Sequence, residues 1–367
     1  MRSQTWGTCT DLSAVAPTSL RSEEHGDPIG ALSLSVVRSR NIHDLTDHLR
    51  PYDVRFLHSG PMNGMSEIVQ AHWNEIVLAS WRFEQPLIHQ GKLPSGRITF
   101  GLRDVRQCLV KWHGTALDFD DLTVSGSQTE VDIVSAPGFS TLAVSFPERM
   151  VQTAAERLGL SLRFHHKCRL VFPIGEVFGV RARTIWKVLL NYAVEYPWRP
   201  SELKWFAEQC AELLKCLLLG CARSTPSDLP CENRNRFRIV KQALAAIDEE
   251  PGEPLRIADL CRLTHASERA LHYAFTEYLN VSPARYLKLH RLQGAHRDFR
   301  RTDRIGVKTA DIANDWGFWH LGQFAKDYRD LFGELPSDTH WRTREAARSR
   351  PTRLLANRSS PNTVMAR

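Results

Sequence analysis

Arginine, lysine and histidine side chains are frequent in the last third of this 367-residue chain, and the whole chain carries a formal net charge of +7. Guanidinium and ammonium groups neutralise phosphates, and arginine, lysine and amide side chains also form hydrogen bonds with the edges of bases. These residue types suit nucleic-acid binding, provided that the elements beneath them hold them on an exposed face. The modest positive charge favours a polyanionic partner without identifying it.

The cysteines and histidines show no pattern of a metal centre or a catalytic nucleophile. The eight cysteines include no C-x-x-C pair and no companion histidines at zinc-finger spacing, so we expect reduced thiols. No H-x-H occurs, and His165 and His166 would point to opposite faces of a strand. We therefore expect no metal, no cofactor and no enzyme activity. Because no window approaches the roughly 18 apolar residues of a membrane span, we expect a cytoplasmic protein without membrane association.

The chain divides by composition into five segments. Residues 1–30 and 349–367 are predicted to be flexible tails. Residues 31–222 are predicted to form an effector-binding and dimerisation domain, and residues 223–235 form a polar, proline-bearing linker. The pattern of residues 236–348 predicts closely spaced helices, and we expect this segment to form the second domain.

Short runs rich in β-branched and aromatic residues, separated by turn residues, predict antiparallel strands in the first domain. The predicted strands are Asn74–Phe83, Gly96–Leu102, Val105–His113, Glu130–Val134 and Ser140–Phe146. Their spacing predicts a small β-sandwich or barrel. Helices are predicted over residues 146–160, 180–195 and 201–219, the first with Pro147 at its start and Gly159 near its end.

The last of these helices carries one apolar stripe. Its members, three and four residues apart, are Leu203, Phe206, Cys210, Leu213, Leu214 and Leu217. Such a stripe either packs inward or forms the seam of a dimer, and the pattern leaves both alternatives open.

One supersecondary unit occurs twice in the second domain. Residues 257–283 align with residues 309–336 when one extra residue is allowed in the second turn. Each unit predicts a short first helix (257–263 and 308–314), a break, and a second helix with apolar residues four apart. This is the helix-turn-helix pattern, in which the second helix enters a DNA major groove.

The signals for helix starts and turns agree with this pattern. Ser267 is a natural N-cap for the second helix of unit one, and Gly317 suits the sharp turn of unit two. Between the units, Ser282 and Pro283 start a predicted helix of about 20 residues, or roughly 30 Å. Successive major grooves recur about every 34 Å, so this connecting helix would allow two reading helices to enter adjacent grooves.

Three stretches carry a family resemblance: "IADLC" to "SERALHYAF", then "SPARYLKLHRLQGAHRDF", and then "TADIANDWGFWHLGQFAKDYRDLFGELPSD". Residues 236–345 resemble the DNA-binding domain of AraC/XylS-type bacterial transcription regulators, and "WGFWHLGQFA" is closest to the branch of the ethanolamine-operon regulator. The resemblance implies seven helices and an N-terminal domain that senses a ligand or partner and mediates dimerisation. It also implies double-stranded DNA and RNA polymerase as partners, and a homodimer.

Carried over position by position, the resemblance implies base-facing places on both second helices: Arg269, His272 and Tyr273 in unit one, and Leu321, Gly322, Ala325 and Lys326 in unit two. Three of the last four have no side chain that hydrogen-bonds a base, so we expect weaker discrimination by the second reading helix. Phosphate or flanking contacts are expected from Ser267, Arg285, Lys288, Arg300, Lys308, His320, Gln323 and Arg329.

The strand-rich region resembles the cupin-like effector domain attached to many AraC-type regulators. His72, Trp81, Trp112 and His113 are candidates for an effector pocket, with ordinary core as the alternative. The expected fold is α+β: an N-terminal cupin-like β-sandwich or barrel with helices, and a C-terminal all-α domain of two helix-turn-helix units joined by a long helix.

The expected function is sequence-specific, DNA-binding transcriptional regulation under the control of an unidentified small-molecule effector. The alternatives are a DNA-binding module fused to an enzyme domain, for alkyl transfer or metal-cupin chemistry, and a nonspecific architectural DNA binder.

Overall fold

A computed structural model describes most of the chain between Leu32 and Arg348. The predicted tails, residues 229–233 of the predicted linker, and His166 lie outside the described residues. The described residues are 32–46, 48–49, 51–62, 64–165, 168–195, 203–228, 234–249 and 255–348.

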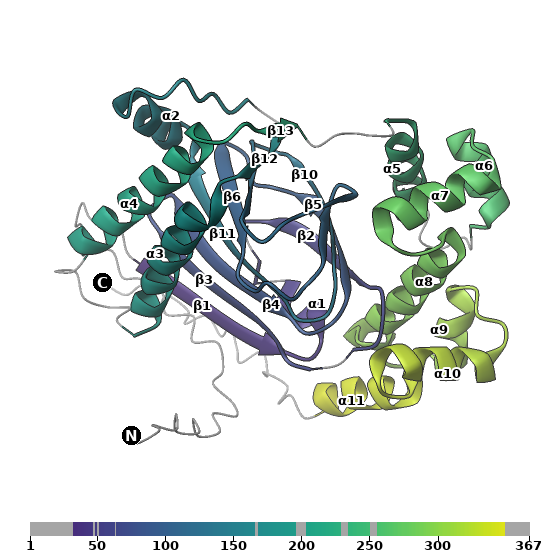
Figure 1. The fold of residues 1–367 in the computed structure, drawn as a ribbon. Helices are drawn as coiled ribbons and strands as arrows, with labels where there is room; N and C mark the ends of the chain where they lie inside the picture. Colours follow the sequence, from purple (N-terminus) through teal and green to yellow (C-terminus); the bar gives the residue numbers. More distant parts are fainter. Residues whose placement is uncertain are drawn as a thin grey trace, which may run out of the picture. The chain divides into compact units, whose positions relative to one another are not determined.

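Two antiparallel sheets form the first region (Figure 1). The larger sheet has eight strands, in the order β1 (Leu32–Ser39), β3 (Ser66–Trp73), β4 (Ile76–Phe83), β11 (Phe139–Pro147), β6 (Arg97–Arg103), β9 (Asp121–Ser125), β12 (Arg169–Pro173) and β13 (Ser227–Asp228). The smaller has five, in the order β2 (Asp53–His58), β5 (Leu87–Lys92), β10 (Glu130–Ser135), β7 (Val110–Trp112) and β8 (Thr115–Ala116). A short helix, α1 (Ile42–Thr46), precedes β2.

Alternating side chains of the larger sheet supply two separate cores. On β4, Val77, Ala79 and Trp81 join side chains of the smaller sheet in a core between the two sheets. The intervening Ile76 and Leu78 belong to a second core, beneath the helices on the opposite face. This period of two is what strand geometry imposes on a sheet that is buried on both faces. The predicted cupin-like sandwich or barrel with helices is therefore confirmed.

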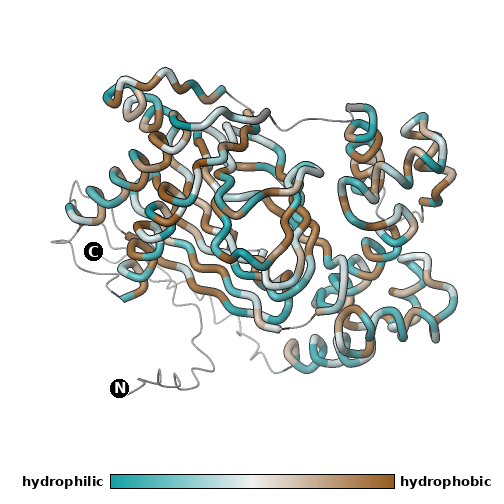
Figure 2. The backbone as a smooth tube through the Cα atoms, in the orientation of Figure 1, coloured by the Kyte–Doolittle hydropathy of each residue, from teal (hydrophilic) through white to brown (hydrophobic). Residues whose placement is uncertain are grey.

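Three helices cover the outer face of the larger sheet: α2 (Glu148–Arg157), α3 (Gly175–Glu195) and α4 (Leu203–Ala222). Figure 2 shows hydrophobic residues recurring along α3 and α4. The stripe of α4 packs inward, because Phe206, Cys210 and Leu213 are completely buried. The alternative of a dimer seam on this stripe is therefore wrong. No helix in the described ranges combines the length and apolar character needed to cross a membrane.

The predicted strand Val105–His113 is wrong over most of its length, because only Val110–Trp112 forms a ladder. The preceding residues wrap around the buried guanidinium of Arg103. That group donates to the carbonyl oxygens of Leu117 at 2.8 Å and Arg106 at 3.1 Å, and also to that of Cys108. A buried cation needs several acceptors, and here the loop supplies them instead of pairing with a neighbouring strand.

The second region contains seven α-helices among the described residues, as the resemblance implied. They are α5 (Arg234–Glu249), α6 (Ile257–Thr264), α7 (Glu268–Leu279), α8 (Pro283–Phe299), α9 (Thr309–Asp315), α10 (Leu321–Phe332) and α11 (Pro336–Arg348), with a short 3-10 turn, η2 (Thr302–Arg304), after α8.

The predicted caps of these helices are confirmed. Ser267 accepts a hydrogen bond from the Ala270 amide at 3.2 Å and so caps α7. Ser282 accepts one from the Arg285 amide at 3.3 Å, with Pro283 as the first residue of α8. The connecting helix α8 has 17 residues, or about 25 Å, which is shorter than predicted.

Candidate DNA-binding surface

The second helix of unit one, α7, exposes one polar face. Arg269, His272, Tyr273 and Thr276 are all exposed at intervals of three, one and three residues, which places them on the same side of the helix. The opposite side is buried and holds the helix in place. Its members are Leu271, Ala274, Phe275, Tyr278 and Leu279. The three residues predicted to face bases in unit one therefore lie together on one outward surface, to which Thr276 adds a hydroxyl.

Arg269 is supported by an aromatic ring one turn away. Its guanidinium carbon lies 5.5 Å from the centre of the Tyr273 ring, and its Nη2 lies 3.4 Å from the Tyr273 hydroxyl. The guanidinium of Arg236 approaches the same ring at 5.7 Å. A cation that rests on a ring loses less side-chain entropy when it binds, so Arg269 is well placed to present two parallel donors to a guanine.

The second helix of unit two, α10, exposes a largely apolar face. Leu321 is 43% exposed, Gly322 and Lys326 are exposed, and Ala325 is partly buried between them. Arg329 continues this face one turn further on. The inward side carries Phe324, Tyr328, Leu331 and Phe332, all buried. The four residues predicted to face bases in unit two are thus brought together, with Lys326 as the one charged side chain among them.

The turn before α10 is fixed by aromatic packing on the connecting helix. Gly317 has φ +76°, in the left-handed region that glycine adopts without strain. The Trp316 ring packs against Gly294 of α8, and its Nε1 donates to Asp298 at 3.0 Å. Phe318 packs on Phe324 with ring centres 4.7 Å apart. The packing of Trp316 and Phe318 therefore fixes the start of α10.

Trp319 differs from its neighbours, because its side chain is 71% exposed at the start of the reading helix. Thr276 was missed entirely, although it lies seven residues after Arg269 and therefore on the same helical face.

The residues predicted to contact phosphate fall into two groups. Three already have partners within the protein: Arg285 donates to the Ser59 carbonyl at 3.2 Å, Lys288 lies 2.7 Å from Asp327, and Arg300 pairs with Asp44. The side chains of Lys308, His320 and Arg329 are exposed and make no hydrogen bond or ion pair to any other described residue.

The two remaining flanking residues have local roles in the protein. Ser267 caps α7, as described above, and Gln323 donates to Asp327 at 3.0 Å. The assignment of all eight residues to phosphate or flanking contacts remains a prediction.

The smaller sheet packs its outer side against the second region. Strands β2, β5 and β10 contribute Leu57, Ile88 and Val134 to the core of the helical region. Polar contacts surround them: Arg55 of β2 lies 2.7 Å from Asp248 of α5, and Tyr286 of α8 donates to Gln90 of β5 at 2.9 Å.

The four residues proposed for an effector pocket do not line one space. The register of β3 and β4 pairs His72 with Val77 and Trp81 with Ile68, which puts His72 and Trp81 four residues apart along the strands. Trp81 belongs to the core between the sheets. Trp112 and His113 adjoin each other, with ring centres 5.4 Å apart, and His113 Nδ1 lies 3.3 Å from Asp132. Their role in effector binding remains a prediction.

Comparison with known proteins gives the surface a context. A helix-turn-helix domain model matches residues 260–342. The probable thc operon regulatory protein of Rhodococcus erythropolis is 36% identical over 100 residues, which is 27% of this chain and 30% of that protein. The XylDLEGF operon transcriptional activator of Pseudomonas putida is 33% identical over 93 residues, or 25% of this chain and 29% of that protein.

A solved structure of a probable AraC family transcriptional regulator from Rhodopseudomonas palustris is 37% identical to this chain. The match covers 29% of this chain and 97% of that one, with a TM-score of 0.26. The helix-turn-helix region of this chain is of the AraC/XylS type. The chain spans less than a third of the length of either curated relative above, and the match lies in this AraC/XylS-type region.

Proposed function

We propose that this AraC/XylS-type chain is a sequence-specific regulator of transcription that acts in the cytoplasm as a homodimer, together with RNA polymerase, under the control of a small-molecule effector. The observation that carries the proposal is the pair of exposed faces, one on each second helix of a helix-turn-helix unit. Arg269, His272 and Tyr273 form one face, and Lys326 among apolar neighbours forms the other. Two different faces imply two different readings of base edges.

Backbone contacts would come from cations that flank these faces. Lys308 and Arg329 lie in unit two, and neither is engaged by another described side chain. Such contacts fix the register of a protein on the duplex and carry no sequence information of their own. Specificity in unit one is therefore assigned to the α7 face.

Effector control requires a physical link between the two regions, and the packing of the smaller sheet against α5 and α8 supports one. Strand β5 is part of both cores: Leu87 and His89 point between the sheets, while Ile88 and Gln90 point to the second region. A ligand that shifts β5 changes the surface on which α8 rests. Regulation follows only if the effector binds one arrangement more tightly than the other.

Unsatisfied polar groups between the sheets support an effector site there. Gln70 is completely buried, and neither atom of its amide has a partner among the described residues. The same holds for Trp81 Nε1 and His89 Nδ1. Burial lowers the pKa of His89 to about 3, so this ring is neutral and offers one donor and one acceptor. Water or a polar effector would satisfy these atoms.

The alternative of an alkyl-transfer enzyme finds little support in the cysteines. Such a nucleophile needs a lowered thiol pKa. Burial instead raises the pKa of each of the six cysteines in the described ranges, to about 12 for Cys210 and about 11 for Cys168.

Genomic footprinting with the tagged protein, followed by gel-shift titration, tests the proposal. We expect binding at discrete upstream sites, with affinity at physiological salt at least about a thousandfold above that for random duplex. Equal affinity for footprinted and random DNA would refute sequence-specific regulation and favour an architectural binder.

Sedimentation at micromolar concentration tests the homodimer separately. A purely monomeric chain, with and without the footprinted DNA, would refute that part of the proposal. Because the α4 stripe is buried, substitutions there are expected to unfold the first region rather than to separate two copies.

A further inference from the structure

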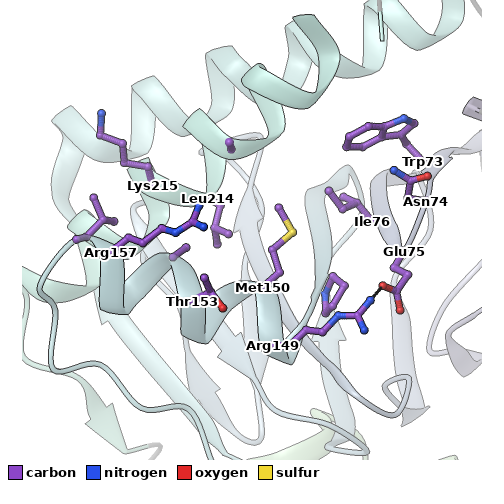
Figure 3. A pocket seen from close by; sticks show the side chains of 14 residues that line it. Trp73, Asn74, Glu75, Ile76, Arg149, Met150, Thr153, Arg157, Leu214 and Lys215 are labelled. Atoms are coloured by element: carbon purple, nitrogen blue, oxygen red, sulfur yellow. Dashed lines mark hydrogen bonds and ion pairs between the residues drawn. The ribbon is translucent and has the colours of Figure 1, made fainter. Parts of the chain in front are cut away.

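A groove of about 660 Å³ lies outside the two sheets, between α2, α4 and the turn from β3 to β4 (Figure 3). It is separate from the interior in which the buried amide of Gln70 lies, because its walls come from the helix-covered side of the larger sheet. Its volume falls within the range of roughly 300 to 1,000 Å³ that is typical of sites for small organic molecules.

The floor and walls of the groove are apolar. Met150 and Ala154 of α2 face Leu214 and Ala211 of α4, and Trp73 closes the end near the turn. Figure 3 shows Met150 between the two ends, with Trp73 and Asn74 at one end and Arg157 and Lys215 at the other. Such walls favour the apolar body of a ligand by removing it from water.

The charges at the rim are unevenly compensated. Arg149, near the turn, is paired with Glu75. Lys215 lies 3.5 Å from Glu212, a carboxylate that also pairs with Arg181. Arg157 is exposed and has no hydrogen-bond or ion-pair partner among the described side chains. The end of the groove that holds Arg157 and Lys215 therefore carries uncompensated positive charge.

We infer that this groove binds an amphipathic organic anion, with its apolar body along Met150 and Leu214 and its carboxylate or sulfonate against Arg157 and Lys215. A neutral apolar molecule would leave the cations unused, and an organic cation would be repelled. A second copy of the chain fits poorly, because a two-fold contact of this face with itself would bring together the same positive groups.

Binding to this groove stands independently of DNA recognition, whereas any regulatory consequence rests on the proposed function. The groove contacts α2 and α4, and both helices pack on the larger sheet. An anion held there would therefore act on the first region from the side opposite to the second region.

The test uses the full-length protein and two ligands of equal chain length. Binding of fluorescent anilinonaphthalene sulfonate is titrated first, and dodecanoate and dodecanol are then added as competitors. We expect dodecanoate to displace the probe at a concentration roughly tenfold below that of dodecanol, because only the carboxylate forms a charge-assisted contact.

Three variants locate the site. Arg157→Gln should weaken dodecanoate roughly three- to tenfold and leave dodecanol unchanged. Ala211→Trp, at an exposed position of α4 that lines the groove, should weaken both ligands by filling the space. Lys204→Gln removes a charge from an exposed position of α4 outside the groove and should change neither. Thermal unfolding checks that all three variants fold.

Several results would overturn the inference. These are equal displacement by dodecanoate and dodecanol, wild-type affinity in both Arg157→Gln and Ala211→Trp, and probe affinity that falls as protein concentration rises, which would identify a second copy as the occupant. A chain that binds footprinted DNA but not dodecanoate refutes the groove and leaves the proposed function intact. A chain that binds dodecanoate but no specific DNA supports the groove and refutes the proposed function.

Discussion

The two reading helices share an interior and differ in what they present to solvent. In α7 the inward residues Leu271 and Phe275 are completely buried, and in α10 Phe324 and Tyr328 take the equivalent places. The outward faces have no such correspondence. Unit one presents a guanidinium, an imidazole and a phenol, whereas unit two presents Leu321, Gly322 and Ala325 beside one lysine. Packing constrains the buried residues of each reading helix, whereas the residues on its outward face can differ between the two units.

The units also differ in how their reading helices begin. The Ser267 side chain accepts from the backbone of α7 and so satisfies one of its free amides. At the start of α10, His320 provides no side-chain cap. The first-turn amides of α10 therefore remain available to a phosphate, which the positive end of the helix would favour. We therefore expect unit one to read base edges and unit two to combine backbone contact with apolar contact.

The largest expected effect is on stability, and two glycines distinguish the buried packing of unit two from its exposed face. A Cβ at Gly294 would come within 3.0 Å of the Trp316 ring, closer than real Cβ atoms approach, whereas a Cβ at Gly322 would meet nothing within 4 Å. We expect Gly294→Ala to lower the free energy of unfolding by about 3 kcal/mol, and Gly322→Ala to leave it equal or slightly higher. Urea denaturation of the two variants measures both. Equal stability would show that α8 and the second turn adjust freely.

The next effect concerns the polar face. Arg269→Ala should weaken binding to a footprinted site by roughly 1 to 3 kcal/mol and relax base choice at one position. The reason is the loss of a paired donor, while the caps and core of α7 remain in place. Binding selection from a random DNA pool, compared between variant and wild type, gives both results. Unchanged selectivity would mean that α7 does not read bases.

Periodicity and capping residues predicted the helices and their buried sides, because those signals lie close together in the sequence. Ser267, Ser282 and Pro283 act within one helical turn. The apolar residues of the α4 stripe recur every three or four residues, which is visible in the sequence. Strand β5 was missed for a physical reason. Leu87, Ile88 and His89 are all buried, since one side of β5 faces the sheet interior and the other faces the second region, so no alternation marks the strand.

For the candidate site, the sequence predicted which residues share a helix face, but it did not predict their contacts with distant parts of the chain. The helical period places Arg269, His272 and Tyr273 together without knowledge of the fold. The partners of Arg285 and Arg300 were not foreseeable, because Ser59 and Asp44 lie 226 and 256 residues away in the sequence. Long-range pairs of this kind leave no local signal. The groove beside Arg157 was hidden in the same way, since its walls come from three separate segments.

A smaller effect is expected from the apolar face of unit two. Leu321→Ala should weaken specific binding by about 0.5 to 1 kcal/mol, because Leu321 contributes at most an apolar contact with a thymine methyl. The loss should disappear on a site in which uracil replaces the contacted thymine. Leu321 is 43% exposed, so its truncation should leave stability nearly unchanged. A loss as large as that of Arg269→Ala would contradict the difference drawn between the two helices.

The smallest effect should come from a backbone contact, and its signature is salt dependence. Arg329 continues the α10 face and has no partner among the described side chains, so Arg329→Ala should remove one phosphate contact. The slope of log affinity against log salt should fall by about one, equally for specific and random DNA. Lys204→Ala, an exposed charge on α4 of the first region, serves as the matched control and should leave the slope unchanged. If Arg329→Ala instead lowers only specific affinity at constant slope, then Arg329 reads a base, and unit two is less apolar in its recognition than its exposed face indicates.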